Sequence, residues 1–148
     1  MIVYRISHVR FARLTASGRE ARWSSTGNFV LYTASNRSLA CLENVVHRDR
    51  EGLMGDYRIL NIEIPEKVAI ETVTLNQLPE NWKSQETIIC RQLGDTWIEK
   101  GKSCVLCVPS AIIPQETNYL INTQHPDFKF IKLLSIEEFS FDTRIKSA

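Results

Sequence analysis

Residues 22–47 constrain the fold most, because they pass from a polar loop to a strand and then to a helix. The apolar run at residues 29–33 predicts the strand, and the pattern that follows predicts a helix over residues 36–49. Ser35 and Asn36 have short side chains that can accept the unpaired amide hydrogens of a first helical turn. We expect Ser35 to be the N-cap of this helix.

One face of this helix carries a carboxylate among apolar side chains. Leu39, Leu42, Val45 and Val46 recur at helical spacing and predict the buried face, and Glu43 projects on the same side. Burying an unpaired carboxylate costs several kcal/mol. Glu43 is therefore expected to be paired with an arginine, to reach solvent at the edge of the stripe, to be protonated, or to face a ligand cavity.

The loop before the strand is rich in hydrogen-bond donors. Arg22 and Trp23 are followed by Ser-Ser-Thr-Gly, which suits an anionic ligand because a guanidinium matches the geometry of phosphate. In the alternative interpretation, Trp23 fixes the loop and Arg22 pairs with a carboxylate such as Glu43.

Two further residues are candidates for a binding site. Tyr32 lies near the end of the predicted strand, where it could stack on a flat ring or belong to the core. Arg5 lies on a first strand at residues 2–6, and its side chain could face a cleft or solvent.

The remaining pattern predicts more strands than helices. Residues 86–100 are expected to form a helix that breaks or kinks near Gly94 and ends at Gly101. Its predicted buried side consists of Ile88, Ile89, Leu93, Trp97 and Ile98. The most apolar segment, residues 103–108, is expected to be the central strand. The other predicted strands cover residues 57–64, 68–73, 118–122, 128–134 and 139–141. Because their order does not repeat as βαβ units, we predict an α+β fold with a mixed or antiparallel sheet, and residues 1–148 as one domain.

Composition limits the other classes of function. With 43% hydrophobic residues the chain can fill one core. The 18 basic and 17 acidic residues give a net charge of +1 without long runs of one sign, so we expect no general nucleic-acid binding. No segment has the length of a membrane span and the N-terminus does not have the pattern of a signal peptide, so we expect a cytoplasmic protein without membrane attachment.

Cys104 and Cys107 have the C-x-x-C spacing of zinc and redox sites. No second pair accompanies them, and their surroundings are apolar and typical of a strand, so we interpret them as buried strand cysteines.

The ordered set of motifs RWSSTG, LYTAS, LACLE, GDTW, CVPSAI, NYLIN, HPDF and FDTR resembles the RES domain family, from residue 4 to about residue 144. The characteristic arginine, glutamate and serine of that family correspond to Arg22, Glu43 and Ser110, and its tyrosine to Tyr32. Arg5 matches an early Tyr-Arg pair. The family usually has asparagine after Arg-Trp, where this chain has Ser24.

The resemblance implies a toxin of a bacterial type II toxin–antitoxin system with an Xre-type antitoxin as partner, a fold similar to ADP-ribosyltransferases, and possible oligomerisation through the antitoxin. It implies that NAD+ is consumed as a substrate by hydrolysis, phosphorolysis or ADP-ribosyl transfer, with no resident cofactor or metal. Glu43 would stabilise positive charge on the ribose or activate the acceptor, while Arg22 and Arg5 would bind the pyrophosphate. Tyr32 would pack on the nicotinamide, and Ser110 would hydrogen-bond the nicotinamide ribose.

Two other classes of function remain open on the sequence. Glu43 and His47, one helical turn apart, could form a metal or acid–base pair, although two ligands are too few for a zinc site. Alternatively, Arg22 and Glu43 could form a buried ion pair in a partner-binding module without catalysis. Geometry separates these interpretations, because an enzyme should have Arg22, Tyr32, Glu43 and Ser110 at one cleft.

Overall fold

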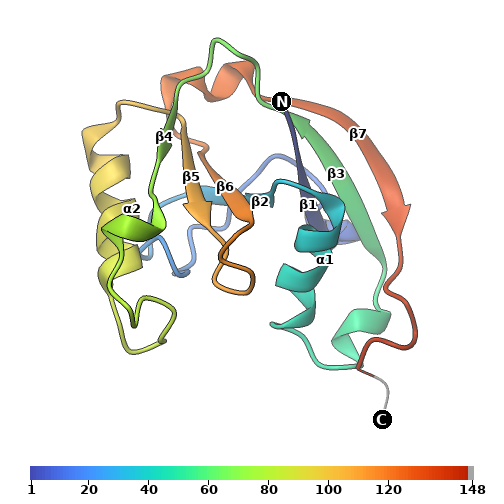
Figure 1. Ribbon diagram of the computed structural model, residues 1–148. Coiled ribbons are helices and arrows are strands. Elements are labelled where there is room, and N and C mark those ends of the chain that lie inside the picture. Colours follow the sequence, from blue (N-terminus) through green and yellow to red (C-terminus); the bar gives the residue numbers. More distant parts are fainter. Residues whose placement is uncertain (147–148) are drawn as a thin grey trace.

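The computed structural model describes residues 1–146, which fold around one seven-stranded sheet (Figure 1). The strands run in the order β4-β5-β6-β2-β1-β3-β7, and β4 with β5 forms the parallel pair in an otherwise antiparallel sheet. Their bounds are Ile2–His8 for β1, Val30–Ala34 for β2, Tyr57–Glu63 for β3, Ile70–Thr72 for β4, Val105–Pro109 for β5, Thr117–Asn122 for β6 and Lys132–Phe139 for β7. The predicted α+β fold with a mixed sheet is confirmed.

Two α-helices and four short 3-10 helices complete the described chain. The α-helices are α1, Arg37–Val45, and α2, Ile89–Lys100; the 3-10 helices are η1, Val9–Phe11, η2, Gly52–Met54, η3, Leu75–Gln77, and η4, Pro126–Phe130. None of the helices within residues 1–146 is long and apolar enough to cross a membrane.

Both α-helices pack on the same face of the sheet. In the register of the strands Leu120 lies opposite both Leu106 and Tyr32, while Ala34 lies two residues beyond Tyr32 and so on the same face. Leu106 and Leu120 pack with α2, and Ala34 packs with α1. The two helices therefore lie on one face of the sheet, apart from each other, with the middle of the sheet between them (Figure 1).

The opposite face of the sheet carries a second apolar core. Val3, Leu31, Leu60 and Ile121 are fully buried there, beneath partly buried side chains of residues 12–16 and of η4. The sheet is therefore covered by apolar packing on the face opposite to the helices.

The expected start and buried face of α1 need correction. Asn36, not Ser35, is the N-cap, because its side chain accepts the Leu39 N–H at 2.8 Å. The helix ends at Val45, before the predicted residue 49. Leu39 is buried, whereas Leu42 and Val46 are 39% and 50% exposed, because this short helix contacts the sheet along the side of Leu39 and Ala40.

Helix α2 is continuous through Gly94, so the predicted break there is wrong. A Cβ at Gly94 would lie 1.7 Å from the Trp23 carbonyl oxygen, which shows that glycine permits a close approach of the 22–28 loop. Ile88 precedes the helix and is 54% exposed, contrary to its predicted burial. Gly101 ends the helix with φ of 60°, as predicted.

Strand β5 is interior but not central, because β2 occupies the middle of the sheet and β4 pairs with β5 on its outer side. All five of its residues are buried, which explains its apolar run. Cys104 and Cys107 are buried free thiols, so their predicted burial is confirmed. Cys107 lies on β5, and Cys104 directly precedes this strand.

The end of the described chain differs from the prediction. Residues 128–130 belong to η4, and one strand, β7, replaces the two expected closing strands. Phe141 lies after β7 and is buried against Tyr57 and Phe139, so its apolar character comes from ring packing rather than from a strand.

Candidate active site

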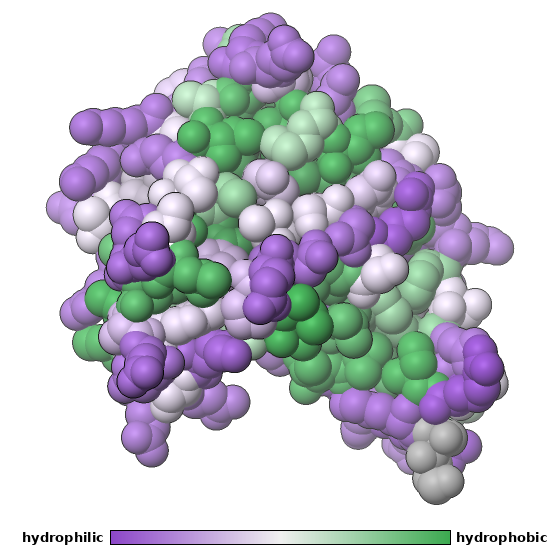
Figure 2. Space-filling model, in the orientation of Figure 1, coloured by the Kyte–Doolittle hydropathy of each residue, from purple (hydrophilic) through white to green (hydrophobic). Residues whose placement is uncertain are grey.

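A cleft opens where β1 and β2 separate. The two strands pair at one position, Tyr4 opposite Ala34, and beyond it Arg5 Nη1 donates across the gap to the Tyr32 carbonyl at 3.1 Å. The cleft has a volume of about 1220 Å³ and extends between α1 and the loops around residues 19–23 and 84–87. Figure 2 shows the molecule hollowed along its lower edge, between the parts that carry α2 and α1.

Glu43 lies in this cleft, held by two neutral donors. Its Oε1 accepts a hydrogen bond from Asn118 Nδ2 at 2.7 Å and one from Ser110 Oγ at 3.0 Å. Its Oε2 has no hydrogen-bond partner among residues 1–146. The carboxylate therefore has a fixed orientation, one oxygen free for a ligand and no neutralising cation.

Ser110 lies behind Glu43 rather than on the surface of the cleft. It follows β5, is fully buried, and its hydroxyl oxygen accepts the N–H groups of Ile112 at 3.1 Å and Ile113 at 3.2 Å. These two donors leave the Ser110 proton directed to Glu43. The geometry thus assigns the hydroxyl to orienting the carboxylate.

Arg22 lines the cleft without pairing with Glu43. Its Nη1 donates to the carbonyls of Trp82 at 3.3 Å and Lys83 at 3.2 Å. Within residues 1–146 no ion pair joins Arg22 to Glu43, so the alternative of a buried Arg22–Glu43 pair is wrong.

Tyr32 contributes a wall of the cleft and holds the preceding loop. Its hydroxyl accepts the Trp23 N–H at 3.2 Å and hydrogen-bonds Ser24 Oγ at 2.8 Å. Burial raises the Tyr32 pKa, so the phenol remains protonated and neutral. Ser24 is 1% exposed and uses its hydroxyl for this contact, so the residue that departs from the family pattern is part of the loop support.

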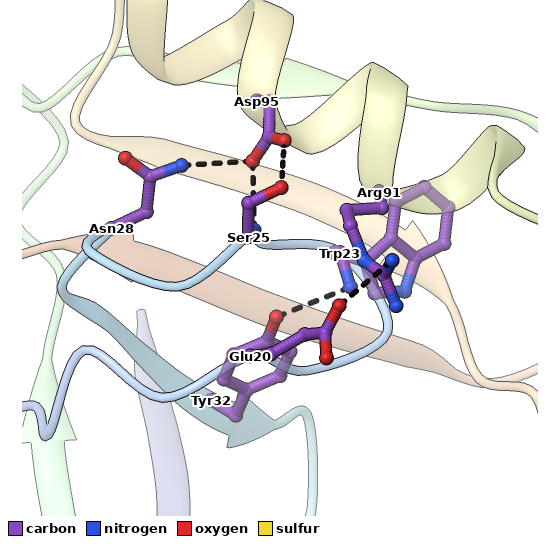
Figure 3. A network of polar contacts seen from close by, with 7 residues as sticks. All are labelled: Glu20, Trp23, Ser25, Asn28, Tyr32, Arg91 and Asp95. Carbon is purple, nitrogen blue, oxygen red and sulfur yellow. Dashed lines mark hydrogen bonds and ion pairs between the residues drawn. The ribbon is translucent and has the colours of Figure 1, made fainter.

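The same loop is fastened to α2 by Asp95, as Figure 3 shows. Asp95 Oδ1 accepts the Ser25 N–H at 2.9 Å and Asn28 Nδ2 at 2.8 Å, while Asp95 Oδ2 accepts the Ser25 hydroxyl. Asp95 and Asn118 were not among the residues predicted from the sequence, although both lie in motifs named above, GDTW and NYLIN. A polar residue inside an otherwise apolar element was the available signal.

The cleft carries an excess of positive charge. Six arginines and two glutamates line it: Arg5, Arg13, Arg19, Arg22, Arg48 and Arg91, with Glu20 and Glu43. Glu20 is paired with Arg91 at 2.8 Å. This excess suits an anionic ligand.

Arg5 is a half-buried cationic group of the cleft. Burial is the main cause that lowers the pKa of Arg5, and the positive charge of Arg48 lowers it further. The Arg5 Nε atom is buried and has no hydrogen-bond partner among the described residues. Since an arginine remains charged in proteins, an anion in the cleft would compensate this desolvated cation.

His47 also lines the cleft, one turn after Glu43. The described part of the chain contains no group of three or more His, Cys, Asp or Glu side chains that could hold a metal ion. Among the described residues, no third side chain of these types therefore joins Glu43 and His47 to complete a metal site.

Fold and cleft together define a class: an α+β protein that presents an oriented glutamate at an arginine-rich opening in a mixed sheet. The RES domain family matches residues 2–142. The chain belongs to this family.

The relatives have similar lengths. A Prs ADP-ribosylating toxin of Sphingobium sp. is 38% identical, over 84% of this chain and 79% of the relative. A protein named Toxin Res from Photorhabdus laumondii is 34% identical, over 100% of this chain and 99% of the relative. Among solved structures, the M. tuberculosis MbcT–MbcA toxin–antitoxin complex contains a similar chain, with a TM-score of 0.77, 15% identity, and coverage of 94% of this chain and 84% of that chain. The structural likeness shows the shared fold.

Proposed function

We propose that the protein is the toxin of a toxin–antitoxin system and that it consumes NAD+ by cleaving the bond between nicotinamide and ribose. The observation that carries this proposal is the Glu43 carboxylate, oriented by two neutral donors and left with a free oxygen inside an arginine-rich cleft. Family membership and the toxin names of the relatives supply the biological setting.

The positive charge of the cleft fits the pyrophosphate of NAD+. Arg22 and Arg5 are the proposed ligands, because a guanidinium forms charge-assisted, often bidentate hydrogen bonds with phosphate oxygens. Arg22 donates to two backbone carbonyls, which are neutral acceptors that a phosphate can replace. The ring of Tyr32, held by its hydroxyl contacts, provides a flat surface for the nicotinamide.

Glu43 is the proposed catalytic residue. When the glycosidic C–N bond breaks, its electron pair leaves with nicotinamide, which becomes neutral, and positive charge develops on the ribose. A carboxylate oxygen near the ribose would stabilise that charge. The acceptor oxygen then bonds to the anomeric carbon, and its proton passes to Glu43 or to solvent.

Ser110 is proposed as a positioning residue in this reaction. The direct contact with ribose predicted from the resemblance is less compatible with a fully buried side chain whose hydroxyl already serves Glu43. By holding Oε1, Ser110 would fix the orientation of the Glu43 carboxylate and so direct Oε2 towards the substrate.

A second candidate reaction is ADP-ribosyl transfer to a protein. It is favoured by the 38% identity to a relative named an ADP-ribosylating toxin. The first bond broken is the same, and the acceptor is then a side chain of the target rather than water or phosphate.

The proposed partner in the cell is an antitoxin of the Xre type, as the family resemblance implies.

Purified protein incubated with NAD+, with and without phosphate, tests the proposal. We expect loss of NAD+ and release of nicotinamide, with ADP-ribose identifying hydrolysis and ADP-ribose 1″-phosphate identifying phosphorolysis by mass. Labelled NAD+ in bacterial lysate tests transfer, which should label a protein. A protein inactive in all three assays would contradict NAD+ consumption and favour a binding module.

A further inference from the structure

Asn118 contacts the proposed catalytic carboxylate of Glu43 and was not among the site residues predicted from the sequence. It lies on β6, opposite Ala34 of β2 and Val108 of β5, on the sheet face that also carries the helices. Its Nδ2 donates to Glu43 Oε1 at 2.7 Å, which is shorter than the 3.0 Å contact from Ser110 to the same oxygen. A carboxylate only accepts hydrogen bonds, so the amide nitrogen must be the end that faces Glu43.

The other end of this amide has no partner among the described residues. Asn118 Oδ1 is buried and accepts no hydrogen bond within residues 1–146. Leaving a buried acceptor unpaired costs free energy, so the arrangement needs an explanation beyond packing.

Two asparagines on the same sheet show what a structural role looks like. Asn61 on β3 uses both ends of its amide, donating to Ser135 Oγ at 2.8 Å and accepting Arg37 Nη2 at 2.9 Å. Asn122 on β6 accepts the Gln124 N–H at 3.0 Å. Asn118 instead uses its side chain to hold Glu43.

We infer that Asn118 is a positioning residue for the reaction of Glu43: with Ser110 it fixes Oε1, so that Oε2 is the oxygen presented to substrate, and it does so without adding charge. This inference rests on the proposed function. A lysine or arginine at this position would neutralise the carboxylate, and an aspartate would repel it, whereas an amide orients the group and leaves its charge intact.

Replacing Asn118 by Ala removes the donor and adds no charge. We expect kcat for NAD+ cleavage to fall roughly ten- to hundredfold, as loss of a hydrogen bond to a charged group implies, with KM changed much less. Because N118A adds no ionisable group, it separates the loss of the donor from the effect of an added carboxylate.

Replacing Asn118 by Asp gives a readout that a structural role would not produce. Two adjacent carboxylates share one proton, and the protonated carboxyl introduced by N118D could donate to Glu43 as the amide does. As pH rises and the shared proton leaves, this donor is lost and repulsion appears. The ratio of N118D to wild-type kcat should therefore fall with increasing pH. The other charged or titratable groups near Glu43 in the cleft, Arg5, His47 and Arg48, are the same in both proteins, so the ratio reports the effect of the added carboxyl group.

Asn122→Ala and Asn122→Asp are matched controls, since Asn122 is a buried asparagine on the same strand that does not line the cleft. Circular dichroism and thermal unfolding establish that each variant is folded. Retention of kcat within twofold by N118A, a pH-independent ratio for N118D, or equal effects from the Asn122 variants would overturn the inference. If the wild type does not cleave NAD+, the proposed function fails and this inference with it; an active wild type with an unaffected N118A refutes the inference alone.

Discussion

The Ser110 hydroxyl donates to Glu43 Oε1 at 3.0 Å, which joins two family residues that lie 67 positions apart in the chain. Ser110 reaches this contact from the end of a buried strand, and Glu43 reaches it from the second turn of α1. The serine is thereby placed to direct the glutamate.

Replacing Ser110 by Ala should lower both activity and stability. Glu43 loses one donor, so kcat should fall about tenfold. The N–H groups of Ile112 and Ile113 lose their acceptor, which should lower the free energy of unfolding by about 1–3 kcal/mol. The matched control is Ser103→Ala, because Ser103 is also buried and hydrogen-bonded but contacts Trp97 and Glu71 instead of Glu43. It should lower stability and leave kcat unchanged. Urea unfolding and NAD+ kinetics measure the two effects, and equal kcat values for both variants would contradict this role of Ser110.

Replacing Gly94 by Ala should destabilise the 22–28 loop through a backbone clash. The added Cβ would lie 1.7 Å from the Trp23 carbonyl oxygen and 2.7 Å from its carbon, so helix and loop must move apart. We expect a loss of about 3 kcal/mol and a higher KM for NAD+, because this loop carries Arg22. Gln92→Ala, at an exposed position of the same helix, should change stability by less than about 0.5 kcal/mol. A fully stable G94A variant with wild-type KM would contradict the predicted contact.

The buried thiols make stability fall at high pH. Burial raises the pKa of Cys104 to about 12, from an ordinary value of 9.0. Above pH 9 the unfolded chain releases this proton while the folded chain retains it, so the contribution is complete below pH 9 and is lost progressively as pH rises towards 12. The slope per thiol is about 1.4 kcal/mol per pH unit. Denaturation curves from about pH 8 to about pH 11 should show a shallower decline for Cys104→Ala than for the wild type; identical slopes would show that Cys104 does not ionise on unfolding.

Several parts of the site were predictable because they depend on local pattern. The helical spacing around Glu43 predicted a carboxylate on an apolar face. The resemblance to the RES family, carried by the ordered motifs, added Arg22, Tyr32 and Ser110 to the predicted site. The structure brings Arg22, Tyr32 and Glu43 to one cleft and places Ser110 directly behind Glu43.

Other parts depend on tertiary contacts that no single segment encodes. Ser35 and Asn36 are equally plausible caps by residue type, and the path of the chain selects Asn36. The contact of Asn118 with Glu43 depends on the pairing of β6 with β2, and the cleft depends on β1 and β2 separating after one paired position. Gly94 looked like a helix breaker because its packing partner, the Trp23 carbonyl, is distant in the sequence.

The central claim is that the Glu43 carboxylate performs the reaction, and one comparison tests it most directly. Glu43→Gln keeps the volume and removes the charge, while Glu99→Gln makes the same change at an exposed position of α2. With each protein folded, as judged by thermal unfolding, NAD+ loss should be followed over time. We expect E43Q to cleave NAD+ at least about a hundredfold more slowly than the wild type, a barrier increase of about 2.7 kcal/mol or more, and E99Q to keep the wild-type rate. A folded E43Q that consumes NAD+ at the wild-type rate would contradict the claim.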